Sequence, residues 1–111
     1  MPPRYKSNVV ATTKMLGNEV CRIVLETEES VDLPTFCETF TEGEAVRIEL
    51  DNNASSADCV MNGMVYDQTD MFVFISCGGL LVKIKRNGRT MMMGSEVAVG
   101  VSKVRRRRRS T

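Results

Sequence analysis

The chain has 111 residues, and its charges nearly balance, with 15 Lys or Arg against 14 Asp or Glu and no His. This length suits one small domain with tails and leaves no room for a second domain. Without histidine, histidine-based acid–base and nucleophilic chemistry is excluded, and no Gly-rich phosphate loop or G-x-S-x-G turn is present, so we expect no enzyme.

The charge is distributed unevenly along the chain. Residues 1–82 carry five basic and thirteen acidic side chains, whereas residues 83–111 carry ten basic and one acidic. An acidic body with a basic end fits a polyanionic ligand on one side and complementary protein neighbours on the other. The five arginines at 105–109 are typical of phosphate binding and also of a nuclear import signal, and both interpretations stay open.

The four cysteines are Cys21, Cys37, Cys59 and Cys77, and they form no C-x-x-C pair. We therefore expect no zinc site, no other metal and no cofactor. Because no N-terminal signal pattern and no apolar run near membrane-spanning length occur, we expect neither an oxidising compartment nor a membrane, and four reduced, buried thiols.

Residues 1–13 are polar and aperiodic, which predicts a flexible extension. The apolar residues of segment 15–25 fit a helix and a strand equally well, so both stay open. Asp32 and Pro34 then suit the start of a helix that ends near Gly43. The apolar residues at helical spacing in this segment are Leu33, Phe36, Cys37 and Phe40.

Five short segments in the second half of the chain predict strands: 46–50, 57–66, 71–75, 80–85 and 96–104. Apolar residues alternate with polar or small residues in 46–50, 80–85 and 96–104, whereas 57–66 is less regular. Segment 71–75 is apolar on both faces, which predicts a strand that is central or covered by the helix. Asn87-Gly88 suits a type I′ turn, so a returning strand is expected over residues 90–93. In the last strand small residues such as Gly100 oppose a row of valines, which indicates either the close approach of another backbone or ligand, or a bulge.

One short helix followed by about five strongly bent antiparallel strands predicts a mostly β domain, a small barrel of the Sm-like (SH3-like) or OB kind. We expect this domain over residues 33–105. Residues 1–32 would form the partly flexible N-terminal extension, and residues 106–111 a basic C-terminal tail.

Taken in order, these segments resemble the Sm and Sm-like proteins, most closely the D-type Sm subunits of the spliceosomal snRNP core. Residues 33–44 resemble the family's N-terminal helix, residues 67–70 lie where the first Sm motif has its Asp-x-Met-Asn loop, and residues 85–89 resemble the D-type hairpin. Residues 97–104 align with the second Sm motif. Asp70 replaces the family asparagine, and Gly100 and Val101 replace its arginine and glycine.

The resemblance implies a structural subunit of a heteroheptameric Sm ring, which binds uridine-rich single-stranded small nuclear RNA in pre-mRNA splicing. Such a ribonucleoprotein would act in the nucleus after assembly in the cytoplasm. The implied RNA-binding residues are Gln68, Thr69, Asp70, Gly100, Val101, Ser102, Lys103, Arg105, Arg106 and Arg107. The implied subunit interface consists of Met91, Met93, Val97, Val99 and Val101.

Two other functions stay open. One is an Sm-fold scaffold or assembly module with a degenerate RNA pocket. The other is a monomeric OB-fold binder of single-stranded nucleic acid, which would need exposed aromatic side chains for base stacking. We expect the aromatic residues to lie mostly in the core; they are Tyr5, Phe36, Phe40, Tyr66, Phe72 and Phe74.

Overall fold

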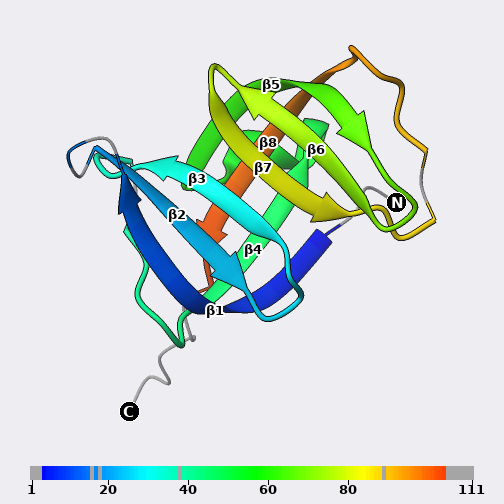
Figure 1. Ribbon diagram of the computed structural model, residues 1–111. Helices are drawn as coiled ribbons and strands as arrows, with labels where there is room; N and C mark the ends of the chain where they lie inside the picture. The colour runs from blue at the N-terminus through cyan, green and yellow to red at the C-terminus, as the bar shows by residue number, and fades with distance from the viewer. Residues whose placement is uncertain (1–3, 16, 18, 38, 89, 105–111) are drawn as a thin grey trace.

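Eight antiparallel strands form a closed barrel in the computed structural model, which describes residues 4–15, 17, 19–37, 39–88 and 90–104 (Figure 1). The strands are β1 (Arg4–Met15), β2 (Val20–Leu25), β3 (Ser30–Pro34), β4 (Ala45–Leu50), β5 (Cys59–Gln68), β6 (Phe72–Cys77), β7 (Leu80–Lys85) and β8 (Glu96–Lys103). A short 3-10 helix, η1 (Asp51–Ser56), follows β4. Around the barrel the order is β1-β2-β3-β7-β6-β5-β8-β4, and β4 pairs back with β1.

Alternate residues of the strands fill the interior of the barrel. In β6, for example, Val73 and Ile75 are fully buried, whereas Phe72 and Phe74 point outward and are partly exposed. The predicted mostly β fold is therefore confirmed. The strands expected over residues 46–50, 57–66, 71–75, 80–85 and 96–104 correspond to β4, β5, β6, β7 and β8.

The first 34 residues supply three strands of the same barrel. β1 occupies most of the segment that we expected to be flexible, and it pairs with β2 and β4. In segment 15–25 the strand interpretation is correct for β2, whose residues Cys21, Ile23 and Leu25 alternate into the core. The barrel thus has eight strands rather than about five, and it includes residues that we assigned to an N-terminal extension.

The predicted helix over residues 34–43 is wrong. Pro34 ends β3, where it pairs with Val20, and the described residues between β3 and β4 form turns and irregular structure. Phe40 is buried, but Phe36 is 91% exposed, so the two aromatic residues do not share one buried face. Their helical spacing was a coincidence of sequence.

A disulfide joins this irregular segment to the barrel. Cys37 is bonded to Cys59 at the start of β5, so the expectation of four reduced cysteines is wrong for this pair. Cys21 and Cys77 are free and buried, as expected.

The predicted hairpin partner of β7 is also wrong. Asn87 and Gly88 do adopt positive φ angles of 51° and 79°, but residues 90–93 form no strand, and β7 pairs instead with β6 and β3. The side chain of Gln68 takes the place of a strand partner for this loop. Its Nε2 donates to the carbonyl of Met91, and its Oε1 accepts from the Met91 N–H, both at 3.0 Å.

Gly100 allows η1 to pack against the outer face of β8. A Cβ atom at this position would lie 2.7 Å from the Cα of Ala54 and 2.7 Å from the Cβ of Ala57. The close approach that the small residues of this strand indicated is therefore that of another backbone.

Candidate functional site

The described residues among those predicted to bind RNA fall into two groups that lie apart. Gln68 ends β5, and Thr69 and Asp70 follow it in the turn before β6, whereas the second group lies on β8. Val60 of β5 pairs with Gly100. Gln68 is eight residues further along β5, which corresponds to about 26 Å of strand. The two groups therefore do not line one pocket.

The described members of these groups mostly have internal roles. Thr69 Oγ1 accepts hydrogen bonds from two backbone N–H groups of its own turn. Val101 is fully buried, and Ser102 Oγ accepts from the Asp58 N–H at 3.1 Å. Lys103 forms an ion pair of 3.1 Å with a glutamate of the irregular segment. Asp70 is exposed. Arg105, Arg106 and Arg107 lie outside the described residues.

The residues predicted for a subunit interface lie mostly inside the barrel. Val97, Val99 and Val101 are buried core residues, Met91 packs against the core, and Met93 is 53% exposed. β8 pairs with β5 on one edge and with β4 on the other. Neither edge of β8 is therefore free for a neighbouring subunit.

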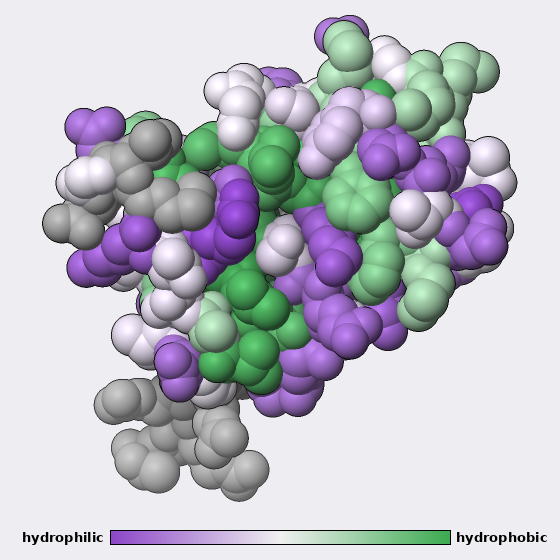
Figure 2. All heavy atoms as spheres, viewed as in Figure 1, coloured by the Kyte–Doolittle hydropathy of each residue, from purple (hydrophilic) through white to green (hydrophobic). Residues whose placement is uncertain are grey.

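A groove on the outer face of the barrel brings together aromatic and basic side chains that the sequence analysis did not associate. Its volume is about 150 Å³, and its lining residues are Arg22, Ser30, Tyr66, Phe74, Leu81, Val82 and Lys83. We call it the aromatic groove. Figure 2 shows hydrophobic and strongly hydrophilic side chains side by side over β6 and β7 on this side of the molecule.

A larger hollow of about 460 Å³ is lined by residues of β5, β6 and β8. Its lining includes no aromatic and no basic residue, and Glu96 is its single charged member. The aromatic groove is therefore the better candidate for a binding site.

The strand register places the groove residues in a row across three strands. Ser30 of β3 pairs with Lys83 of β7, and Lys83 pairs with Phe74 of β6. All three side chains point outward because the residues that alternate with them face the core. The row thus combines a hydroxyl, an ammonium group and an aromatic ring on one surface.

Tyr66 joins this row because β5 is irregular at that residue. The register shifts between Val65 and Asp67, which leaves Tyr66 as the extra residue of a bulge. Bulges commonly redirect a side chain in this way. Tyr66 is 45% exposed, and the centroid of its ring lies 6.2 Å from that of the Phe74 ring. The expectation of core aromatics is therefore wrong for Tyr66, Phe72 and Phe74, as it is for Phe36.

Two cations, Arg22 and Lys83, line the same groove as the aromatic side chains. The Lys83 ammonium lies 4.3 Å from the centroid of the Phe72 ring, within cation–π range. Arg22 comes from β2, and the hydrogen bond from its guanidinium to Asp32 raises the pKa of Arg22 above its ordinary value, against the opposing effect of burial. Electrostatic interaction with the Tyr66 phenol group raises the pKa of Arg22 slightly further. Arg22 is therefore cationic throughout the physiological range.

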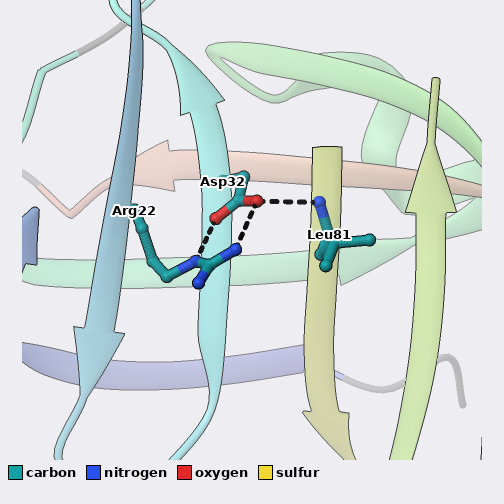
Figure 3. A network of polar contacts seen from close by, with 3 residues as sticks. All are labelled: Arg22, Asp32 and Leu81. Atoms are coloured by element: carbon teal, nitrogen blue, oxygen red, sulfur yellow. Dashed lines mark hydrogen bonds and ion pairs between the residues drawn. The ribbon is translucent and has the colours of Figure 1, made fainter. Parts of the chain in front are cut away.

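The groove crosses the junction between β3 and β7, which we call the β3–β7 seam. Backbone pairing there covers two residue pairs, Ser30 with Lys83 and Val31 with Val82. Beyond this pairing, Asp32 Oδ2 accepts from the Leu81 N–H at 3.0 Å (Figure 3). At the other end, Glu29 Oε2 accepts from the Lys85 N–H at 2.8 Å. Two carboxylates thus extend the pairing of the seam.

In the described part of the chain no group of three or more Cys, Asp or Glu side chains could hold a metal ion, and no helix there is long and apolar enough to cross a membrane. A volume of about 150 Å³ is below the roughly 300 Å³ at which small-molecule pockets begin. The groove therefore suits one unit of a longer ligand.

Comparison with known proteins does not assign the chain to a family. No model of a known protein family matches the chain, and no curated protein matches it.

Proposed function

We propose that this barrel is a non-catalytic module that binds single-stranded nucleic acid through the aromatic groove. The observation that carries the proposal is that the exposed Tyr66 and the partly exposed Phe74 line one groove together with the cations Arg22 and Lys83. Bases of any identity stack on aromatic rings, and nearby cations attract the phosphates that connect them.

The composition of the chain supports the same ligand. Ten of the fifteen basic residues lie within residues 83–111, which begin with a residue of the groove itself. Such a basic segment adds sequence-independent attraction to phosphates. RNA is the first ligand to test because the Sm resemblance also points to it.

Among the functions considered from the sequence, this proposal is closest to an OB-type binder that acts alone. A heteroheptameric Sm ring, its splicing role and a nuclear location stay predictions from the resemblance. Ring closure of that kind needs an open strand edge, whereas the described strands pair on both sides around the barrel. The present proposal needs no open edge.

The proposal is tested with a fluorescently labelled single-stranded uridine oligonucleotide, whose binding is followed by anisotropy at low salt. Tyr66→Ala and Phe74→Ala should each weaken binding by about 1–3 kcal/mol, the contribution of one stacked base. Phe36→Ala is the matched control, because Phe36 is a highly exposed aromatic residue outside the groove. Its affinity should equal that of the unaltered protein.

Three results would contradict the proposal. The first is the absence of saturable binding to the oligonucleotide at low salt. The second is an equal loss of affinity in Phe36→Ala and Tyr66→Ala. The third is saturable binding of an acidic peptide in the groove without binding of RNA, which would assign the groove to protein recognition.

A further inference from the structure

We propose that Arg22 binds a phosphate group of the ligand in the aromatic groove, and that the buried Asp32 positions it for this task. The inference rests on the proposed function and assigns to one residue the contact with the ligand backbone. We refer to this role of Arg22 as the phosphate anchor.

The guanidinium of Arg22 is held by two hydrogen bonds to one carboxylate. Its Nε lies 2.6 Å from Asp32 Oδ1, and its Nη2 lies 3.0 Å from Asp32 Oδ2 (Figure 3). Asp32 is 2% exposed, whereas 38% of the Arg22 side chain is exposed. A bidentate pair of this kind fixes the plane of the guanidinium as well as its place.

The same geometry leaves the outer part of Arg22 available. A guanidinium has five N–H groups, of which two donate to Asp32. No other described residue accepts a hydrogen bond from Arg22, and the side chain lines the aromatic groove. Asp32 is almost fully buried and is not among the lining residues, so a phosphate in the groove would contact the guanidinium and not the carboxylate.

Asp32 is itself fixed by a third hydrogen bond. Its Oδ2 accepts from the backbone N–H of Leu81, which belongs to β7 and also lines the groove. The carboxylate therefore connects β2, β3 and β7 at one point. Because the anchor is ordered before the ligand arrives, binding costs less conformational entropy.

Lys83 has a different role in the same groove. It presents a single ammonium group on a flexible chain, and this group already lies over the Phe72 ring. Arginine, with its planar fork of donors, matches the geometry of a phosphate better than lysine does. We therefore assign oriented phosphate contact to Arg22 and diffuse attraction to Lys83.

The decisive variant is the double substitution Arg22→Gln with Asp32→Asn. It removes one positive and one negative charge, so the net charge of the protein is unchanged, and the asparagine oxygen can still accept from Leu81. We expect the uridine oligonucleotide to bind about tenfold more weakly. The slope of log affinity against log salt should also become shallower by about 0.7, the value for one phosphate contact on a single strand.

Two single variants complete the set. Arg22→Lys keeps the charge but cannot form the bidentate pair, so its affinity should fall nearly as far as that of the double variant. Arg47→Gln is the matched control, because Arg47 lies on β4, opposite β7 in the order of the barrel. Its affinity and salt slope should equal those of the unaltered protein. Circular dichroism and the thermal midpoint establish that each variant is folded.

The outcomes separate this inference from the proposed function. If the unaltered protein binds the oligonucleotide, and either the double variant or Arg22→Lys binds equally well, the anchor is wrong and the groove remains a binding site. If the unaltered protein does not bind the oligonucleotide, inorganic pyrophosphate is titrated while the Arg22 side-chain N–H resonance is followed by NMR. A saturable shift then supports an anion anchor without the nucleic-acid function, and no shift overturns both.

Discussion

At the scale of single residues, two glycines decide how closely parts of the barrel approach one another. A Cβ at Gly63 would lie 2.5 Å from the Sγ of Cys77, and one at Gly100 would lie 2.7 Å from the backbone of η1. Real Cβ atoms do not come this near to other atoms, so any side chain there must displace a neighbour. At Gly100 the neighbour is backbone, which moves less easily than the end of a side chain.

Gly100→Ala should therefore destabilise the protein. The methyl group would force η1 away from β8, and overpacking of this kind costs about 1–3 kcal/mol. The free energy of unfolding, measured by urea titration, should fall by that amount. Ser76→Ala is the control, because Ser76 is a small, partly exposed residue on the outer face of β6. Its effect should stay within about 0.5 kcal/mol. Equal stability of Gly100→Ala and the control would show that η1 does not depend on the glycine.

At the scale of elements, the β3–β7 seam is closed in part by side chains. Its backbone pairing covers two residue pairs, and the carboxylates of Asp32 and Glu29 accept N–H groups of β7 on either side. Both carboxylates are almost fully buried. When a buried acceptor is lost, its donor is left unsatisfied. The loss of either carboxylate should therefore lower the free energy of unfolding more than the loss of an exposed hydrogen bond would.

Glu29→Ala should open one end of this seam. The Lys85 N–H and the Thr27 hydroxyl both donate to the Glu29 carboxylate, and the loss of a buried acceptor costs about 1–3 kcal/mol. Hydrogen exchange at the Lys85 amide should become faster, and the free energy of unfolding should fall. Glu29→Gln keeps one acceptor oxygen and should cost less. Glu26→Ala, at an exposed neighbour, should change neither quantity, and an unchanged Lys85 exchange rate in Glu29→Ala would contradict the role of the seam.

The elements also show which features of this fold a sequence can reveal. β4, β7 and β8 were predictable because apolar residues alternate with polar or small residues along them. β6 was predictable as a short apolar run bounded by turn residues. The path of the chain after β7 was not predictable from such a pattern. The turn at Asn87-Gly88 forms, but no returning strand follows it, and the free edge of β7 pairs with β3, about fifty residues earlier in the chain. Local patterns do not encode the choice between near and distant strand partners.

The residues of the candidate site were also hard to predict, because they come together only through pairing of distant strands. The apolar residues on both faces of segment 71–75 suggested a covered strand, whereas Phe72 and Phe74 lie on the outer face beside the groove. Arg22 stood alone in a segment whose structure stayed undecided. It reaches Phe74 and Lys83 only through the pairing of β2, β3, β7 and β6. One signal in the sequence could have located the groove. The strand with Phe72 and Phe74 is followed directly by the strand in which Lys83 and Lys85 alternate with apolar residues.

At the scale of the whole molecule, closure of the barrel satisfies the strand edges. β4 pairs with β1 across about forty residues of sequence, and β8 lies between β4 and β5. Open edges promote pairing with other chains, and closure removes them. The exposed apolar residues Met92 and Met93 lie in the loop before β8, outside this ladder of strands.

The isolated chain should therefore be a monomer of 12.4 kDa. Size-exclusion chromatography with light scattering should give this mass over a wide range of protein concentration, because no strand of the described barrel needs a partner chain. With a short uridine oligonucleotide, the mass should rise by that of the oligonucleotide alone. Met92→Ser with Met93→Ser is the control for adhesion through the loop, and it should leave the mass unchanged. A mass several times that of the chain that persists in this variant would mean that the strands open to pair with other copies, as an Sm-type ring requires.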